Sequence, residues 1–356
     1  MLSREGDFIQ HKSNVIFDVK GLNHPKDKIV AFPRYIPNQK GSRSNENLSY
    51  DKVYSLSDRY KFLREHLPHL IIYDKVFGET MCEVPVDEII QHFHPQKKLE
   101  SLMAGQPQNA FEEKALQFAA DLQEAAGISC NAIGVSGSIL AGLTIKTSDI
   151  DLLIYGEKNS RKAYSVLQHM LKEDHPRIKS YTKKELVALY NFRSKDTHMS
   201  FEDFQRVEKR KAFQGMYQGT DYFIRFVKDW DEHHEHYGDE CYNNVGYAKI
   251  TAKISNNTEA LFTPCNYQLE NVKIIKGPKL TPIKVVSSFR GRFCEQAENG
   301  ETITAQGKIE HVSNKKNGES YYRLILGSNP EDYMVLEQSN AELSTLGHNT
   351  EDNKLR

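Results

Sequence analysis

The stretch "GVSGSILAGLTIKTSDIDLLIYG", residues 134–156, places two aspartates two positions apart within a run of Ile and Leu. In a β-strand, side chains at positions i and i+2 point to the same face. Asp149 and Asp151 are therefore predicted to project together, while Ile150 and Leu152 pack on the opposite face. Carboxylates this close raise each other's pKa unless a cation lies between them. The pattern predicts a metal site for Mg²⁺ (or Mn²⁺), which carboxylates and substrate phosphates hold together.

The residues just before this strand complement the predicted metal site. Gly137 and Ser138 stand where a short apolar strand turns into the helical stretch "ILAGL". A glycine lets a phosphate approach the backbone, and the hydroxyls of Ser136 and Ser138 can donate hydrogen bonds to it. The N-terminus of the short helix adds free N–H groups that favour a triphosphate. Ten residues lie between Ser138 and Asp149, enough for the helix and a return to the neighbouring strand.

Gly-Ser, a gap of about ten residues and then Asp-x-Asp among apolar residues resembles the signature of the polymerase-β-like nucleotidyltransferase superfamily. The wider chain, with "FDVKGLNHP" and "AFPRYIP" before the motif and "FRGRFCEQA" after it, is similar to uncharacterised archaeal proteins that carry such a domain. The resemblance implies transfer of a nucleoside monophosphate from an NTP, such as ATP, to an acceptor hydroxyl. It assigns the metals to Asp149 and Asp151, and the triphosphate to Gly137, Ser138 and Ser136. The acceptor stays open: a nucleic-acid 3′ end, a small molecule or a protein side chain.

Members of this superfamily usually carry a third carboxylate on a later strand, where it takes the proton from the attacking hydroxyl. The matching strand here is "TDYFIRFVKD", and alternation puts Asp221, Phe223 and Arg225 on one face. Among the acids, Asp221 is the first candidate, and Asp229 and Asp231 are alternatives. A site without a third acid, in which Arg225 contacts a phosphate, is equally open. That case favours an alternative function, a catalytically inactive nucleotide- or nucleic-acid-binding module with the same fold.

The succession of sequence patterns predicts three modules and a tail. The predicted units are an N-terminal mixed α/β module, an α/β (α+β) nucleotidyltransferase-like domain, a C-terminal antiparallel β-barrel-like module and a polar tail expected to be disordered, at residues 1–105, 106–240, 241–336 and 337–356. Within them we expect a helix at 55–67 capped by Ser55 or Ser57, and an amphipathic helix at 110–127 that ends at Gly127.

Two further segments carry expectations about local structure. The polar stretch 36–52 is expected to be a loop, and 200–217 is expected to be helical. Within 200–217, "RVEKRKAF" gathers four cations: Arg206, Lys209, Arg210 and Lys211. Glu202, Asp203 and Glu208 are interleaved with them. Such interleaving indicates a solvated helix face. The alternative is that one or two of these cations hold the triphosphate.

The bulk properties narrow the class of protein. The 356 residues are 38% hydrophobic and 27% charged, which suits two to three globular domains. A net charge of −1 gives no general attraction to nucleic acid or anionic membranes, so such binding needs a local patch. The five scattered cysteines form no CxxC pair, and neither GxxxxGK[ST] nor GxGxxG occurs. We expect a cytoplasmic protein without membrane contact.

Two groups of side chains remain as candidate binding sites. The segment around residues 233–241 gathers His233, His234, His236 and Cys241, but without regular metal-ligand spacing, so a polar linker is the preferred interpretation. Residues 271–292 hold six cations and no acid: Lys273, Lys276, Lys279, Lys284, Arg290 and Arg292. With Phe289 and Phe293 beside them they suit single-stranded nucleic acid. The alternative is that both rings, four apart in one strand, belong to the core.

Overall fold

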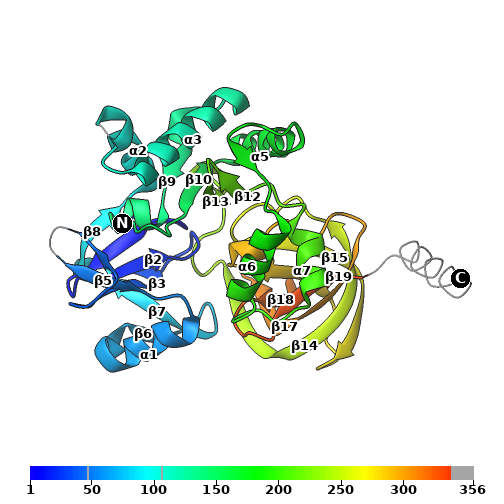
Figure 1. Cartoon of the computed structure of the whole chain (residues 1–356). Helices are drawn as coiled ribbons and strands as arrows, with labels where there is room; N and C mark the ends of the chain where they lie inside the picture. The colour runs from blue at the N-terminus through cyan, green and yellow to red at the C-terminus, as the bar shows by residue number, and fades with distance from the viewer. Residues whose placement is uncertain (46–47, 106, 338–356) are drawn as a thin grey trace, which may run out of the picture.

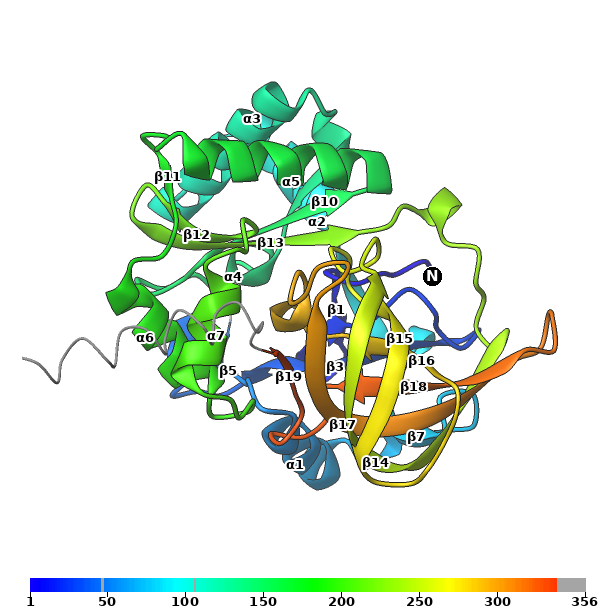
Figure 2. The ribbon, with the colours of Figure 1, turned by 90° about the vertical axis from the view of Figure 1, so that its right-hand side faces the viewer.

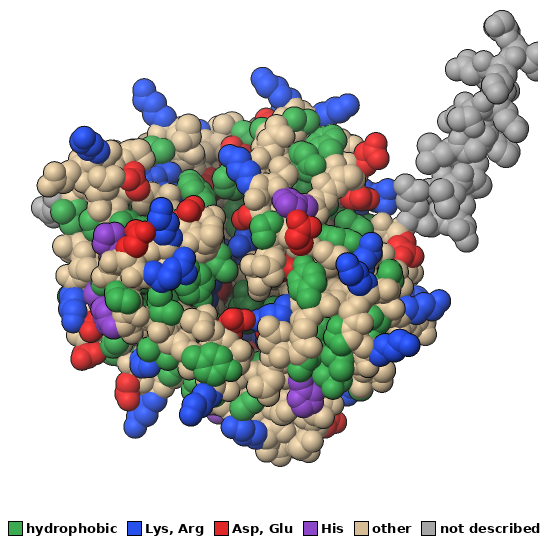
Figure 3. All heavy atoms as spheres, turned by 90° about the horizontal axis from the view of Figure 1, so that it is seen from below, with side chains coloured by type: hydrophobic (Ala, Val, Ile, Leu, Met, Phe, Trp, Pro, Cys, Tyr) green, Lys and Arg blue, Asp and Glu red, His purple; other side chains and the backbone are tan. Residues whose placement is uncertain are grey.

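The computed structural model describes residues 1–45, 48–105 and 107–337, and contains three β-sheets of eight, five and six strands. Figure 1 shows the first sheet (blue) and the third (yellow to red) beside each other, with the second sheet and its helices above them. Seen from below, the surface has a recess between the N-terminal and C-terminal modules (Figure 3). The predicted disordered tail lies outside the described residues from 338 onward. In the part of the chain described, no helix is both long and apolar enough to cross a membrane.

The first sheet belongs to the N-terminal module and has the order β4-β5-β3-β2-β1-β8, with β7 beside β3 and β6 beside β7. Its strands are β1 (Phe8–His11), β2 (Ile16–Val19), β3 (Lys28–Pro37), β4 (Arg43–Ser44), β5 (Ser49–Lys52), β6 (Ile71–Asp74), β7 (Glu79–Pro85) and β8 (Ile89–Phe93). Helix α1 (Leu56–His66) begins after Ser55, whose side chain accepts a hydrogen bond from the N–H of Asp58, which confirms the predicted cap. Helix α2 (Pro95–Ala104) follows the sheet.

The segment 36–52, expected to be a loop, contains β4 and β5, so that expectation is wrong for much of it. Strand β5 pairs with β3, and Tyr50 in β5 is fully buried. Strand β5 is polar apart from this buried aromatic residue, and it forms because β3 supplies hydrogen-bond partners for its backbone. A pattern of polar residues hides such a strand.

The second sheet has the order β11-β12-β13-β10-β9. Its strands are β9 (Ile133–Val135), β10 (Ile150–Tyr155), β11 (Ile178–Lys179), β12 (Gln214–Tyr217) and β13 (Thr220–Val227). Helices α3 (Ala110–Ala126) and α5 (Glu157–Lys172) pack on it, and α3 ends at Gly127 in the left-handed conformation, as predicted. Strand β10 is parallel to β13 and antiparallel to β9, and its residues Ile150, Leu152 and Ile154 belong to the core shared with these helices.

The helix expected at 200–217 is confirmed only as α7 (Phe201–Glu208). The end of that segment forms β12, which continues into β13 through a two-residue hairpin at Gln218 and Gly219. Both hairpin residues have positive φ, 46° and 74°. A hairpin of this kind matches the twist of paired strands, so pairing with β13 overrides the local helical pattern.

The third sheet contains β14 (Glu240–Asn256), β15 (Cys265–Lys276), β16 (Ile283–Ser288), β17 (Thr302–Asn314), β18 (Ser320–Leu326) and β19 (Tyr333–Leu336). All its pairings are antiparallel except β16 with β18, which is parallel. The expectation of a wholly antiparallel module is therefore wrong at one pair, since local patterns carry no information about which strand becomes the neighbour. The barrel-like character stays a prediction.

The sequence pattern suggested that Phe289 and Phe293 lie in one strand, and the structure shows that they do not. Strand β16 ends at Ser288, and Phe289 follows it with 37% of its surface exposed. Phe293 lies in a 3₁₀ turn (Gly291–Phe293) and is buried. Only Phe293 is therefore a core residue.

The basic segment after α7 anchors the second sheet to the C-terminal module. Lys211 is buried, and its Nζ lies 2.7 Å from both Oε1 of Glu208 and the carbonyl oxygen of Arg292. Arg210 forms an ion pair of 2.7 Å with Glu301. Helix α7 packs on β19 of that module, and Figures 1 and 2 show α6 (Lys183–Arg193) next to α7. The interpretation as a purely solvated helix face is therefore wrong for these two cations.

Asp196, just after α6, joins the same two modules. Its carboxylate forms ion pairs with Arg290, at 2.7 Å, and with Arg292. We expect Asp196→Ala to leave both guanidiniums without a carboxylate and to lower the free energy of unfolding by about 1–3 kcal/mol. Thermal unfolding of the full chain would show this as a lower midpoint.

The matched control is Glu270→Ala, because Glu270 pairs with Lys253 at 3.0 Å while each side chain is 45% exposed. Exposed pairs contribute at most about 1 kcal/mol. Equal shifts of the midpoint in the two variants would contradict the role given to Asp196.

Candidate functional site

Asp149 and Asp151 lie where β10 begins, on the face opposite its core residues. Asp149 directly precedes the strand, Asp151 is its second residue, and both are half-buried. The pKa of the Asp151 carboxyl is raised to about 7, chiefly by burial and then by the charge of Asp149, while the charges of Lys52 and Arg34 oppose the shift. Two crowded carboxylates of this kind fit a divalent cation, which removes their repulsion.

Gly137 lies against Asp151. Its φ is +62°, and a Cβ added there would stand 1.8 Å from Oδ2 of Asp151. The N–H of Ser136 donates a hydrogen bond of 2.9 Å to the carbonyl oxygen of Asp151. Both the left-handed backbone and the close approach require glycine. The structure thus brings the Gly-Ser turn and the Asp-x-Asp strand together.

The two serine hydroxyls of the turn have protein partners. Ser138 is buried, and its Oγ lies 3.1 Å from Oγ of Ser148, which also accepts a hydrogen bond from the N–H of Ile145. Ser136 Oγ donates to the carbonyl oxygen of Gly6 at 2.7 Å. These bonds close the loop that leads to Asp149 and tie the turn to the N-terminal segment. Contacts of the two hydroxyls with a phosphate stay a prediction.

Asp221 lies at the same end of the sheet as Asp149. The parallel register of β10 and β13 pairs Ile150 with Tyr222. Asp149 and Asp221 directly precede these two residues, so they lie side by side at the start of the two strands. Partial burial of the carboxyl raises the pKa of Asp221, a hydrogen bond from Tyr181 opposes the shift, and the charge of Asp149 adds to it. A raised pKa suits a group that accepts a proton. Its role as the third acid stays a prediction.

The two alternative acids lie at the other end of β13. Asp229 follows the strand and forms an ion pair of 3.0 Å with Arg4. Asp231 belongs to the next 3₁₀ turn (Trp230–Glu232). Neither is near the start of β10, because the parallel register places Tyr155, the last residue of β10, beside Val227.

Arg225 forms an ion pair with Glu5 of the N-terminal segment. The Glu5 side chain is fully buried and also accepts hydrogen bonds from the N–H of Gly21, at 2.8 Å, and from Nζ of Lys20, at 3.3 Å. A phosphate contact from Arg225, as suggested by the sequence, would compete with this carboxylate.

The N-terminal sheet covers the loop before Asp149. Arg43 Nη1 donates hydrogen bonds to the carbonyl oxygen of Leu143, at 2.6 Å, and to Oγ of Ser148, at 3.4 Å. The charges of Lys52 and Arg34 act on Asp151 across the same contact. These cations were not foreseen from the sequence, because they lie about a hundred residues from the motif and no local pattern links them to it.

Other groups in the described residues could hold a metal but lie outside this site. They are Asp7, His92 and His94, and His11, His69 and Glu88, all in or next to the N-terminal sheet. His92 Nε2 is 2.8 Å from Asp7, and His11 Nε2 is 2.6 Å from Glu88. The histidines around 233–241 are in neither group, and His233 is hydrogen-bonded to Asn23 at 2.8 Å. Cys241 lies in β14, and for residues 233–239 the polar linker stays a prediction.

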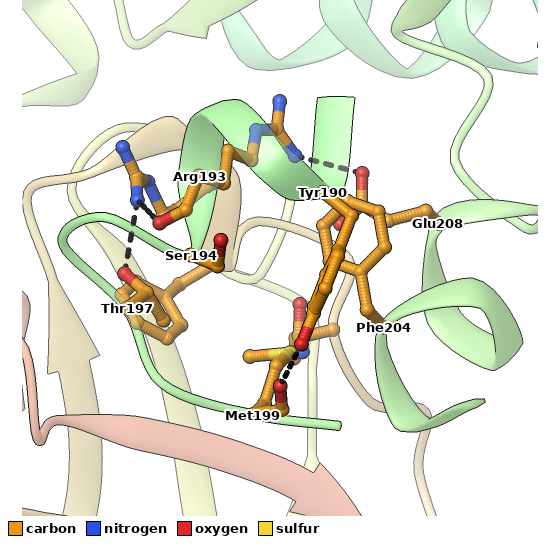
Figure 4. A pocket seen from close by; sticks show the side chains of 10 residues that line it. Tyr190, Arg193, Ser194, Thr197, Met199, Phe204 and Glu208 are labelled. Carbon is orange, nitrogen blue, oxygen red and sulfur yellow. Dashed lines mark hydrogen bonds and ion pairs between the residues drawn. The ribbon is translucent and has the colours of Figure 1, made fainter. Parts of the chain in front are cut away.

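A small cavity lies between α6, α7 and the turn at Arg292, away from the aspartate pair (Figure 4). Its volume is about 20 Å³, which is room for about one water molecule. Arg193 and Glu208 in its wall form an ion pair of 2.8 Å. This cavity is too small for a nucleotide.

The six cations of 271–292 divide into two groups. The four lysines are exposed, whereas Arg290 and Arg292 are bound to Asp196. Only the lysines offer free positive charge to a partner.

Comparison with known proteins agrees with this geometry. The family model "Nucleotidyltransferase domain" matches residues 113–209, which include the Gly-Ser turn and the Asp-x-Asp strand. Over 341 residues the chain is 32% identical to "Uncharacterized protein MJ1086" of Methanocaldococcus jannaschii, covering 94% of this chain and 98% of the relative. This chain belongs to the family of that archaeal protein and carries a nucleotidyltransferase domain. The resemblance found in the sequence is thereby confirmed, and no solved structure matches this chain significantly.

In metal-free buffer, the titration of Asp151 should make this chain less stable as pH rises. Its native pKa of about 7 exceeds the ordinary value of 3.8, so the native state binds the proton more tightly than the unfolded state. The contribution of this bound proton to the free energy of unfolding is complete below about pH 4 and is lost as the pH rises through about 7. Asp151→Asn should therefore raise the thermal midpoint relative to wild type at pH 8 but not at pH 4. A difference that does not change with pH would contradict this assignment.

Gly137→Ala should displace the Asp151 carboxylate, because the added Cβ has no room and the backbone is left-handed. We expect a lower thermal midpoint and at least about tenfold weaker Mn²⁺ binding, measured by calorimetry. Gly142→Ala is the control, since its φ is also positive, +66°, but nothing lies within 4 Å of its added Cβ. Equal loss of Mn²⁺ binding in both variants would show that backbone strain alone is responsible.

Proposed function

We propose that this chain is a Mg²⁺-dependent (or Mn²⁺-dependent) nucleotidyltransferase that moves a nucleoside monophosphate from an NTP to an acceptor hydroxyl. The observation that carries the proposal is the Asp149–Asp151 pair at the start of β10, with Asp151 against Gly137, in a matched nucleotidyltransferase domain. These two carboxylates would hold the metal. A bound metal would neutralise and orient the phosphates.

In the proposed reaction the acceptor oxygen attacks the α-phosphorus and forms a new P–O bond. The bond between that phosphorus and the oxygen bridging to the β-phosphate breaks, and pyrophosphate leaves. Asp221 would take the proton of the attacking hydroxyl, for which its raised pKa and its place beside Asp149 suit it. The triphosphate would lie along the turn at Gly137, where the absence of a side chain leaves the backbone accessible.

Two features of the C-terminal module support a nucleic-acid acceptor. Strand β14 pairs with β15 on one side and β17 on the other, so the succession β14-β15-β16-β18-β17 returns to its start, as in a barrel-like module. Four lysines of this module are exposed: Lys273, Lys276, Lys279 and Lys284. We infer a nucleic-acid 3′ end as the acceptor, with its backbone held by these lysines.

The alternative function is a catalytically inactive nucleotide- or nucleic-acid-binding module. It is favoured by one observation: the residue beside Asp151 on β13 is Phe223, and Arg225, the next on that face, is bound to Glu5.

Incubation of the full chain with each α-³²P-labelled NTP, Mg²⁺ or Mn²⁺, and cellular RNA tests the proposal. We expect label to enter RNA, Asp149→Asn/Asp151→Asn to abolish it, and Asp221→Asn to reduce the rate by about 10²-fold or more. Asp87→Asn, at an exposed carboxylate of the N-terminal module, should leave the rate unchanged. Absence of label, with NTP binding intact, would favour the inactive module.

A further inference from the structure

Two arginines of the N-terminal module converge on one backbone carbonyl, and a lysine lies next to it in the chain. Arg34 Nη1 lies 3.2 Å from the carbonyl oxygen of Val53, and Arg59 Nη2 lies 3.5 Å from the same atom. Lys52 directly precedes Val53. The ion pairs of the described residues include none of these three cations, and Asp18 on the same sheet pairs with Lys20 at 2.8 Å. The carboxylates whose charges reach these cations are Asp18, which is already bound to Lys20, and the Asp149–Asp151 pair.

Arg59 is the most buried of these three cations, and one of its N–H groups has no hydrogen-bond partner. Only 8% of the residue is exposed, and its Nε has no hydrogen-bond partner. The pKa of Arg59 is lowered to about 10, chiefly by burial and then by the charge of Arg34, while the charge of Asp18 opposes the shift. A buried guanidinium with an unpaired N–H group is costly unless an anion binds to it. The cluster is thus suited to bind an anion.

The cluster lies beside the aspartate pair. Lys52 is the cross-strand partner of Tyr35, and Tyr35 packs with Leu140 and Leu143 in one apolar cluster after the Gly-Ser turn. Cross-strand partners share a face of the sheet, so Lys52 projects toward the nucleotidyltransferase domain. An anion held there would lie next to a metal bound by Asp149 and Asp151.

Two exposed aromatic rings flank these cations. The ring of Tyr54 is 5.2 Å from Nζ of Lys52 and 5.2 Å from the guanidinium of Arg34. Phe192 of α6 meets Tyr54 edge to face at 5.6 Å between ring centroids. Tyr54 and Phe192 are 48% and 49% exposed, which is unusual for large apolar groups. Cations beside accessible rings are the combination that binds nucleotides, through phosphate contacts and base stacking.

We propose that Arg34, Lys52 and Arg59, with Tyr54 and Phe192, form a nucleotide-binding site that the N-terminal module adds to the transferase domain. The phosphates lie on the cations and the base stacks against the two rings. This assignment rests on the proposed function, because the bound nucleotide is taken to be one of the two reactants of the transfer. The shared chemistry, a base with its phosphates, is present both in the free NTP and at the end of an acceptor strand.

Binding measurements on the full chain test the site without relying on transfer. The probes are each NTP with Mg²⁺, inorganic tripolyphosphate, and a labelled single-stranded RNA oligonucleotide. We expect Lys52→Met to weaken NTP and tripolyphosphate binding by about tenfold or more. Tyr54→Leu should weaken NTP binding by about tenfold but leave tripolyphosphate binding unchanged, because it removes only the stacking surface.

Matched controls are Lys97→Met, at an exposed lysine of α2, and Tyr73→Leu, at a tyrosine 62% exposed on β6. Neither should change binding, and thermal unfolding should show that all four variants are folded.

Each outcome decides between the two proposals. If the oligonucleotide alone loses affinity, the site holds the acceptor end; if the NTPs alone do, it holds the free nucleotide. Unchanged binding of every probe in both variants, or no binding by wild type, would overturn the site even if transfer occurs. Binding that depends on these residues in a chain without transfer would keep the site and overturn the proposed reaction.

Discussion

The repulsion between Asp149 and Asp151 is the constraint on which the rest of the site depends. An apolar strand holds both carboxylates on one face, and burial keeps one of them with a pKa of about 7. Gly137 is needed because the Asp151 carboxylate occupies the space where a side chain would stand. The Ser138–Ser148 hydrogen bond then sets where the strand begins. Together these contacts hold two carboxylates in the arrangement that a divalent cation would bind.

The face around this pair is assembled from several parts of the chain. Glu5 reaches Arg225, Arg43 holds the loop before Asp149, and Lys52 and Arg34 bring positive charge toward Asp151. In the proposed site, the second sheet would supply the carboxylates and the first sheet would supply the cations. A transferase needs both, because a triphosphate must be held by cations while its metal is held by carboxylates.

The accuracy of the sequence-based expectations depended on the range of the interactions involved. Helix α3, its glycine end and the cap of α1 follow from local rules, and all three are confirmed. The strand at 214–217 and the strands within 36–52 were missed, because pairing with β13 and β3 decided them. The two rings near 290 were assigned to one strand wrongly, since the turn that separates them has no strong signal of its own.

The sequence by itself determined the central motif: Gly-Ser, the intervening loop and Asp-x-Asp, which predicted the metal pair and the family. It could do so because these residues are close along the chain and strand alternation gives their faces directly. Only the tertiary structure showed that Arg34 and Arg59 meet at the Val53 carbonyl, that Lys52 acts on Asp151, and that Glu5 is paired with Arg225. Contacts between segments a hundred or more residues apart depend on how sheets pack, and no local pattern of residues records that.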